Sequence, residues 1–325
     1  MMAPAREWTE RRLGRHLNLR DLNVLMTVAR CGSMGKAAAQ LSISQPAISK
    51  AIADLEYALG VRLLDRSQRG AEPTIYGRAL LERGLNAFDE LKQAVKHIEF
   101  LADPTVGEVR VGASVVVGST VIAAAVDRLS RQHPRITVHL FAAEAAMIYR
   151  ALEERDVDLV IAGIFGPVAK DNMNAEVLYD DPFVIAAGAG SPWCRRRRIK
   201  LADLMNEPWA LPPLDSPTGP IVADVFRAHG LALPHAALIA SSIPSRNALL
   251  ASGRFLTMTP ASVLKLAGGN AEIKALPVEG IPTVGRPIGI LTLKNRILSP
   301  MAELFIGAVR DVASSISKRA NSRKP

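Results

Sequence analysis

The stretch Ile75–Ala102 contains no proline, and its apolar residues recur at spacings of three and four. This period predicts one continuous helix with a length on the order of 40 Å, at about 1.5 Å per residue. Its apolar seam consists of Leu81, Leu85, Phe88, Leu91, Val95 and Ile98. Because so long a helix does not fit inside one small core, we expect it to divide the chain into a short N-terminal part and a longer C-terminal part.

The apolar seam of this helix predicts a partner surface. Heptad-like spacing favours a second copy of the same helix. Packing onto other parts of its own chain is the alternative, and the spacing does not decide between the two. Asp103, Pro104 and Gly107 then end the helix and mark a hinge.

Three shorter amphipathic helices precede it, within residues 19–59. Their apolar stripes are Leu22, Leu25, Met26 and Ala29, then Ala37, Ala38 and Leu41, then Ile48, Ile52, Leu55 and Leu59. Helices joined by such short turns can bury one shared core. Residues 62–77 lose the helical period and contain Gly70 and Pro73, which predicts a β-hairpin followed by a turn.

The starts of the second and third helices are marked by residue type. Ser33 and Ser44 stand directly before them and are predicted N-caps, because a serine hydroxyl can accept a hydrogen bond from a free N–H of the first turn. Pro46 falls in the first turn of the third helix, where its missing N–H costs nothing.

The N-terminal end of the third helix carries side chains that suit DNA. Its inward stripe leaves Gln45, Ser49 and Lys50 near the exposed end. Such an end can enter the major groove, where Gln reads adenine edges and Lys reaches guanine or phosphate. Arg66 and Arg69 of the predicted hairpin can contact the adjacent backbone or minor groove. Helix pairs without DNA-binding function can share this spacing, so the pattern favours DNA binding without proving it.

The net charge and the two cysteines limit the classes of protein to which the chain can belong. Lys and Arg number 40 against 31 Asp and Glu, a formal charge of +9 that favours polyanionic partners and also keeps proteins in solution. Cys31 and Cys194 form no metal-binding motif and fit a reducing compartment. The charged start of the chain lacks the apolar run of a signal peptide, and no uncharged stretch is long enough to cross a membrane. We therefore expect a cytoplasmic protein without membrane segment, metal or cofactor.

The part after Gly107 alternates short β-branched runs with helical patterns. Strands are predicted at residues 108–112, 136–141, 157–161, 183–187, 238–241, 255–258 and 288–293, and helices at 119–132, 145–155, 221–229, 244–251 and 299–315. This alternation predicts parallel βαβ units in two lobes. The last strand, starting just after Pro287, and the last helix return to the first lobe if the chain crosses over twice.

Residues 28–70 resemble the LysR-type transcriptional regulators. The family's pattern appears as Gly32-Ser33, Ala37-Ala38, Leu41, SQPAIS at 44–49, Leu55-Glu56, Leu59-Gly60, Arg62-Leu63 and Arg66. Met34 and Leu64 stand where the family usually has Phe, and Pro73 stands where it usually has Leu. Lys50 replaces a common Arg, which exchanges a bidentate donor for a point charge and puts the base preference at that contact in doubt.

The resemblance implies an α/β protein overall, in which an all-α winged helix-turn-helix with a long linker helix precedes a two-lobed, periplasmic-binding-protein-like effector domain. The implied domains are a DNA-binding domain at 17–74, a linker and dimerisation helix at 75–103, an effector domain at 107–317 and a disordered basic tail at 318–325. The first lobe takes about 107–180 and 286–317, and the second about 181–285.

The same resemblance implies a DNA-binding transcription regulator, not an enzyme. It would bind an inverted-repeat operator and respond to a small-molecule effector in the cleft of the C-terminal domain. Two copies would pair through the linker helix, effector-domain contacts would build a tetramer, and RNA polymerase is a further partner. Residues 243–264 are similar to family members that control sugar uptake or aromatic-acid catabolism.

Effector contacts are predicted where ligands bind in open α/β sheets, beyond the carboxyl ends of strands and near helix N-termini. The residues at these positions are Ser114, Thr218, Ser241, Ser242 and Ser245. Hydroxyl donors there suit a carboxylate or a sugar-like metabolite, and simple helix capping is the alternative for each. Arg246 is predicted as an exposed helix arginine, with neutralisation of an anion as its alternative.

Two other functions stay open on the sequence alone. The doubly wound half can belong to an enzyme, although no GxGxxG, P-loop, GxSxG or HExxH motif supports one. The chain can also be a constitutive DNA-binding protein whose C-terminal half only assembles oligomers.

Overall fold

The computed structural model describes residues 17–67, 70–164, 172–216, 218–266, 272–281 and 285–321. The chain forms two compact units, Met1–Val95 and Lys96–Pro325. Among the described residues, no helix has the length and apolar character needed to cross a bilayer.

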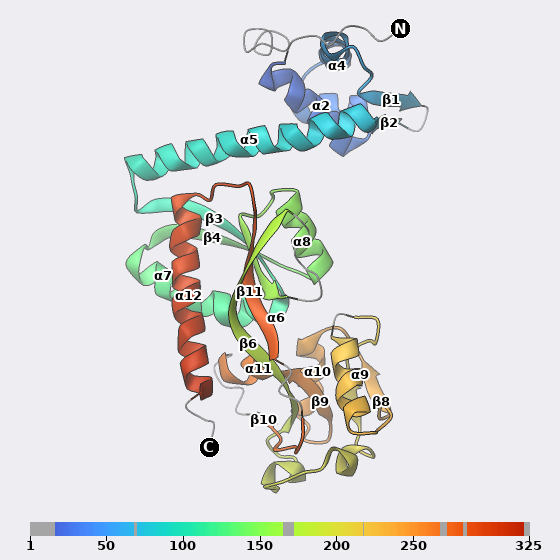
Figure 1. The fold of residues 1–325 in the computed structure, drawn as a ribbon, viewed down its shortest axis with the longest axis vertical. Coiled ribbons are helices and arrows are strands. Elements are labelled where there is room, and N and C mark those ends of the chain that lie inside the picture. Colours follow the sequence, from blue (N-terminus) through green and yellow to red (C-terminus); the bar gives the residue numbers. More distant parts are fainter. Residues whose placement is uncertain are drawn as a thin grey trace. The chain divides into compact units, whose positions relative to one another are not determined.

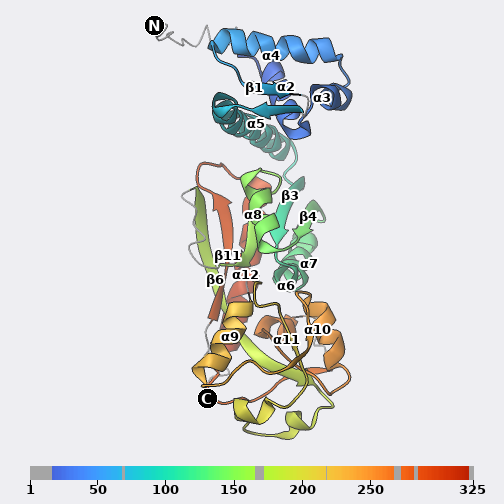
Figure 2. The same ribbon diagram turned by 90° about the vertical axis from the view of Figure 1, so that its right-hand side faces the viewer.

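The N-terminal unit is helical with one β-hairpin (Figures 1 and 2). Its elements are α2 (Leu19–Cys31), α3 (Met34–Leu41), α4 (Gln45–Leu59), β1 (Leu64–Ser67), β2 (Gly70–Pro73) and the first part of α5 (Ile75–Ala102). The three predicted helices, the antiparallel hairpin and the long proline-free helix are thereby confirmed. The core that joins them centres on the fully buried Leu25, Ile48, Ile52 and Leu55.

Local sequence sets the boundaries of these helices. The Ser44 hydroxyl accepts a hydrogen bond from the N–H of Ala47, so the predicted cap of α4 is confirmed. The hydroxyl of Ser33 makes no such bond at α3, so that part of the prediction is wrong. Gly32 and Gly60 end α2 and α4 with φ values of 63° and 73°, a left-handed conformation that glycine adopts without strain.

Helix α5 buries only its first turns in the core of the N-terminal unit. Leu80 and Leu81 pack against that core. Gly84 lies so close to Leu22 that a Cβ added there would stand 2.9 Å from a leucine methyl carbon. Further along, Leu91 and Val95 of the predicted seam are 47% and 54% exposed. The two alternatives therefore apply to different parts of the helix. Its start packs on its own chain and Leu85 and Phe88 are half-buried, whereas Leu91, Val95 and Ile98 of the seam are exposed.

The second unit consists of two α/β lobes joined by two strands (Figure 1). Its strands are β3 (Val106–Ala113), β4 (Arg135–Ala142), β5 (Leu159–Gly163), β6 (Met173–Gly188), β7 (Trp209–Leu211), β8 (Ala236–Ile239), β9 (Leu256–Pro260), β10 (Ile273–Ala275) and β11 (Gly285–Leu293). They follow the order β4-β3-β5-β11-β6-β9-β7-β8, with β10 on β6. Strand β6 pairs with β11 up to Pro182 and with β9 from Phe183, so it runs through both lobes.

Helices cover both faces of each lobe. The first lobe carries α6 (Val115–Val117), η1 (Gly118–Ile122), α7 (Ala123–Gln132), α8 (Ala145–Glu153) and α12 (Pro300–Asn321). The second carries η2 (Pro192–Arg195), η3 (Leu201–Leu204), α9 (Gly219–Ala228), α10 (Ile243–Leu250) and α11 (Ala261–Leu266). Phe305 is buried in the larger core of the first lobe. Trp209 and Phe226 meet edge to face in the core of the second, with ring centroids 5.3 Å apart.

The topology corrects the sequence prediction in several places. The pairs β3–β4 and β3–β5 are parallel as predicted, whereas β6, β10 and β11 pair antiparallel. Strands β7 and β10 are missing from the sequence prediction, and β7 pairs parallel with β8 and β9. Strand β6 begins at Met173 and β11 at Gly285, earlier than predicted. Helix α12 continues to Asn321, where a disordered tail was predicted from residue 318, and residues 322–325 lie outside the described part. The domain boundaries themselves stay predictions.

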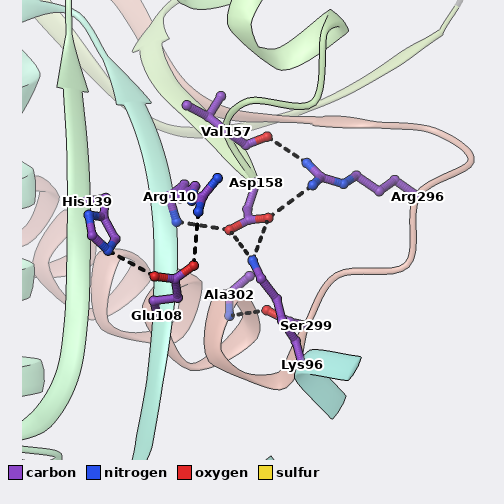
Figure 3. Close-up of polar contacts among 9 residues, drawn as sticks. All are labelled: Lys96, Glu108, Arg110, His139, Val157, Asp158, Arg296, Ser299 and Ala302. Atoms are coloured by element: carbon purple, nitrogen blue, oxygen red, sulfur yellow. Dashed lines mark hydrogen bonds and ion pairs between the residues drawn. The ribbon is translucent and has the colours of Figure 1, made fainter. Parts of the chain in front are cut away.

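A buried ion-pair network lies beside β3 and β5 (Figure 3). The carboxylate of Asp158 accepts hydrogen bonds from Arg296 at 3.0 Å, from the backbone N–H of Arg110 at 2.9 Å and from the Lys96 ammonium at 3.3 Å. Arg296 also donates to the carbonyl oxygen of Val157. This network fixes the end of α5 from Lys96 onward and the loop before α12 to the same buried carboxylate.

Candidate nucleic-acid interface and ligand cleft

The exposed end of α4 carries the side chains that sequence analysis assigns to DNA. Gln45, Pro46 and Lys50 are exposed, and Ser44 is exposed beside them. Ser49 is half-buried and directs its hydroxyl at the sulfur of Met34 on α3, at 3.5 Å. The arrangement therefore presents an amide, an ammonium and the first-turn N–H groups of a helix on one surface. These are donors that fit base edges and phosphates.

The hairpin beside α4 is anchored at the start of β2. The N–H of Ala71 donates to the carbonyl oxygen of Gly32 at 2.9 Å, and Gly70 adopts a φ of 133°. Arg66 is exposed on β1, with its guanidinium 3.9 Å from Glu56. Arg69, the other predicted hairpin contact, lies outside the described residues. One arginine of the predicted wing is thus placed on the surface, with a loose ion pair that leaves its donors available.

In the second unit, several parallel strands are each followed in the chain by a helix. β3 ends at Ala113 and is followed by α6, while β7, β8 and β9 are followed by α9, α10 and α11. Each of these helices therefore begins beyond the carboxyl end of a strand. In open α/β sheets, ligands bind at this end of the strands and near the helix N-termini.

A cavity of about 360 Å³ separates the first turns of α6 and η1 in one lobe from α10 and α11 in the other. Its lining residues are Val115, Val116, Ser119, Thr120, Ile243, Pro244, Asn247, Ala248, Ala251, Val263 and Glu272. This volume and the mostly apolar lining with a few polar groups are typical of small-molecule sites. Segment η1 is one π-helical turn, a rare feature that is frequent at functional sites.

None of the five predicted effector residues lines this cavity. Ser242 caps α10, since its hydroxyl accepts from the N–H of Ser245 at 3.2 Å, and the Ser245 hydroxyl donates to it at 2.8 Å. Thr218 stands before α9 and meets the hydroxyl of Ser216 at 3.3 Å. Ser114 precedes α6 without a side-chain cap bond, and Ser241 is exposed in the loop before α10.

Sequence reasoning missed the polar side chains that do line the cavity. Ser119 and Thr120 lie four residues after Val115 and Val116, and Asn247 lies four after Ile243, so each set shares one helical face. That spacing is visible in the sequence, but which helical face meets the other lobe is not. The side-chain oxygen of Asn247 is buried without a hydrogen-bond partner among the described residues.

Arg246 overturns the prediction of an exposed helix arginine. Its residue is 2% exposed, and burial lowers the pKa of its guanidinium to about 10. Nη1 donates to the carbonyl oxygen of Ala240 at 2.6 Å, whereas Nε has no partner among the residues that the structure describes. Among the described residues, no group of three potential metal ligands occurs anywhere in the chain.

Two family models match the chain. The model described as LysR substrate binding domain matches residues 102–314, and the model described as bacterial regulatory helix-turn-helix protein, lysR family, matches residues 19–78. The first alone covers more than half of the chain.

Individual relatives extend over almost the full length. The HTH-type transcriptional regulator GbpR of Azospirillum brasilense is 26% identical over 305 residues, covering 94% of this chain and 89% of its own. A full-length OxyR variant from Pseudomonas aeruginosa has a similar fold, with a TM-score of 0.67, 21% identity and coverage of 93% and 97%. Full-length CbnR in complex with its target DNA gives a TM-score of 0.53 at 24% identity, with coverage of 91% and 100%.

Proposed function

The chain belongs to the LysR family of DNA-binding transcription regulators, and from this premise we propose which of its residues contact operator DNA and where its effector binds. The observation that carries the DNA-binding part is the exposed N-terminal end of α4, with Gln45 and Lys50 on one surface. The cavity between the lobes carries the effector-binding part.

In this proposal Gln45 and Lys50 enter the major groove, with Ser49 beside them. Ser44, Pro46 and the N–H groups of the first turn lie against phosphate. Arg66 and Arg69 of the hairpin follow the adjacent backbone or minor groove, and Ser33 lies at the start of the supporting helix α3. A lysine at position 50 supplies one point charge, so its contact contributes to affinity more than to base choice.

Two copies would pair through the uncovered seam of α5 and present two α4 helices to an inverted repeat. Support comes from the exposure of Ile98 and Leu101, at 66% and 70%, in line with Leu91 and Val95. Isolated apolar side chains on a surface are common, but a row at helical spacing is typical of a helix–helix interface. Contacts between effector domains would build a tetramer, and RNA polymerase would be its partner in the cytoplasm. We assign the chain no catalytic step.

The effector would bind between the lobes, against η1 and α10, so that its presence favours one arrangement of the two lobes over another. A ligand can shift such an equilibrium only by its difference in affinity between the two states. Ser114, Thr218, Ser241, Ser242 and Ser245 stand at or beside the starts of α6, α9 and α10 and in this proposal would supply further hydroxyl contacts. The alternative of a constitutive DNA-binding protein leaves the cavity without a role.

The first test is selection of genomic DNA fragments by the purified protein at fixed ionic strength, because phosphate contacts make affinity depend on salt. The expected result is an enriched inverted repeat, with binding lost in Gln45→Ala and weakened in Lys50→Ala. The control is Lys36→Ala, an exposed lysine on α3 outside the proposed contacts. Salt-sensitive binding without any enriched sequence would contradict the proposal and indicate an architectural role.

A further inference from the structure

Arg246 is a buried cation without a counter-ion in the part of the chain that the structure describes. Among the described residues, its guanidinium has one hydrogen-bond acceptor, the carbonyl oxygen of Ala240, and no carboxylate lies within ion-pair distance. A guanidinium withdrawn from water without a paired charge is costly, and the lowered pKa of Arg246 reports that cost.

A second buried arginine in the same unit shows how this chain satisfies such a group when the role is structural. The Arg296 side chain is 2% exposed, as Arg246 is, but it is paired with the carboxylate of Asp158 at 3.0 Å and also donates to the Val157 carbonyl oxygen at 2.6 Å. Arg246 lacks the equivalent of Asp158. The difference indicates that its counter-ion comes from outside the chain.

The guanidinium of Arg246 lies at the ligand-binding edge of the second lobe. Its acceptor, Ala240, directly follows β8, and the N–H of Ala240 donates to Leu211 at the end of β7. The neighbouring strand β9 contributes Thr259 to the same end of the sheet, and the buried Thr259 hydroxyl has no hydrogen-bond partner within the described residues. The positive end of the α10 dipole lies there too, because α10 begins at Ile243.

The cavity adjoins this edge through α10. Ile243, Pro244 and Asn247 line it, and they belong to the same two turns as Arg246. Apolar side chains dominate the lining, and the one charged residue among the described lining residues is Glu272, a carboxylate. An anionic ligand in the cavity therefore needs a cation from outside this lining, and the buried Arg246 of α10 is the candidate.

We propose that the effector is an organic anion, whose apolar body occupies the cavity and whose carboxylate takes Arg246 as its counter-ion at the carboxyl edge of β7, β8 and β9. Binding exchanges the contact of the guanidinium with the neutral Ala240 carbonyl for a charge-assisted bond, which is stronger. In this proposal the unpaired hydroxyl of Thr259 donates a second hydrogen bond to the carboxylate. This inference rests on the effector function proposed above and narrows the class of its ligand.

The test compares acids with neutral amides of the same shape on the full-length protein. Sodium benzoate is paired with benzamide, and sodium hexanoate with hexanamide, each at millimolar concentration, and the melting temperature of the protein is measured. The expected result is stabilisation by at least one acid and none by its amide. Arg246→Met removes the charge and retains an apolar stem, so the acid should bind about 10- to 100-fold more weakly.

Matched variants separate the proposed role from a structural one. Arg246→Met should melt no lower than the wild type without ligand, because it removes an unpaired charge, whereas a structural arginine would lower the melting temperature when lost. Arg246→Lys keeps a charge and should keep part of the response even where the methionine variant folds poorly. Arg227→Met replaces an exposed arginine of α9 and should leave the response unchanged.

The outcomes are distinguishable. Equal stabilisation by acid and amide, or an undiminished response in Arg246→Met, overturns the anion while leaving ligand sensing in place. No stabilisation by either class overturns the anion proposal. If operator binding then also ignores a wider set of neutral metabolites, the proposed effector function fails with it.

Discussion

Replacing Asp158 by asparagine should destabilise the C-terminal unit strongly. Asp158 is buried, with its side chain 4% exposed, and it is the carboxylate on which Arg296, Lys96 and the N–H of Arg110 converge (Figure 3). The substitution Asp158→Asn preserves size and an acceptor oxygen but removes the negative charge. It takes from the buried Arg296 guanidinium the carboxylate with which it is paired at 3.0 Å, and removal of one partner of a buried ion pair is costly.

The expected loss in free energy of unfolding follows from how deeply Arg296 and Lys96 are buried. Loss of one partner from a buried pair costs about 3–5 kcal/mol. For a unit of this size that corresponds to a fall in melting temperature of roughly 6–20 °C. Lys96 is less buried, with its side chain 21% exposed, so Lys96→Met should cost about 1 kcal/mol or less, because solvent screens its pairing.

Differential scanning calorimetry of the full-length protein measures both changes. The transition of the C-terminal unit should move in Asp158→Asn, and the transition of the N-terminal unit should stay in place. Combining Asp158→Asn with Arg296→Met removes the stranded charge, so the double variant should be more stable than the sum of the single losses predicts. If the two losses simply add, or if Asp158→Asn costs no more than Lys96→Met, the buried pair is not what stabilises this region.

Three further substitutions, one of them with a matched control, test the elements that position the two sites. Gly77→Ala places a Cβ 2.0 Å from the carbonyl oxygen of Leu63, so we expect unfolding of the N-terminal unit at a lower temperature and loss of operator binding. Ser44→Ala removes the cap of α4 and should cost about 1 kcal/mol in urea unfolding, and Ser33→Ala, which loses no cap bond, should cost less. Ala248→Trp fills the cavity and should abolish the response of the melting temperature to effector while fragment selection recovers the same DNA sequence.

The N-terminal unit could be predicted from the sequence because its determinants are local. The apolar stripes of α2, α3 and α4 repeat within a few residues, and Gly32, Gly60 and Ser44 mark the boundaries. The side chains at the start of α4 are exposed by the same period that buries Ile48 and Ile52. A helical pattern therefore predicts which residues face DNA as well as which form the core.

Most helices and strands of the C-terminal unit could be predicted from the sequence, but the way its strands pair could not. Strand β6 extends over Met173–Gly188, and its first half contains Asn174, Glu176 and Asp180, which do not show the apolar run of a buried strand. Its partner there, β11, begins about a hundred residues later, at Gly285. Such long-range antiparallel pairing leaves no local signal, because strand propensity depends on the neighbours that a strand meets.

The ligand site was the least predictable part for the same reason. Serine at a helix start has the same local signature whether it caps the helix or contacts a ligand, and in Ser242 the structure finds the cap. An arginine in the second turn of a helix has no sequence mark that separates an exposed position from a buried one. Arg246 is buried because α10 lies across the sheet of the second lobe, and that packing joins segments far apart in the chain.

The contrast between the two buried arginines argues that the unpaired one is a property of the site and not of poor packing. The same unit places a carboxylate against Arg296 and adds a backbone N–H and an ammonium to complete the network. If Arg246 served only stability, a paired carboxylate or an apolar residue of similar length in its place would raise the free energy of unfolding. The Nε of Arg246, the hydroxyl of Thr259 and the side-chain oxygen of Asn247 are buried without partners among the described residues. Arg246 and Asn247 belong to α10, and Thr259 belongs to the strand β9 beside it. Such clustering is expected where a bound molecule supplies the missing partners. Binding of a ligand carboxylate should therefore stabilise this edge of the second lobe more than the contacts within the chain do.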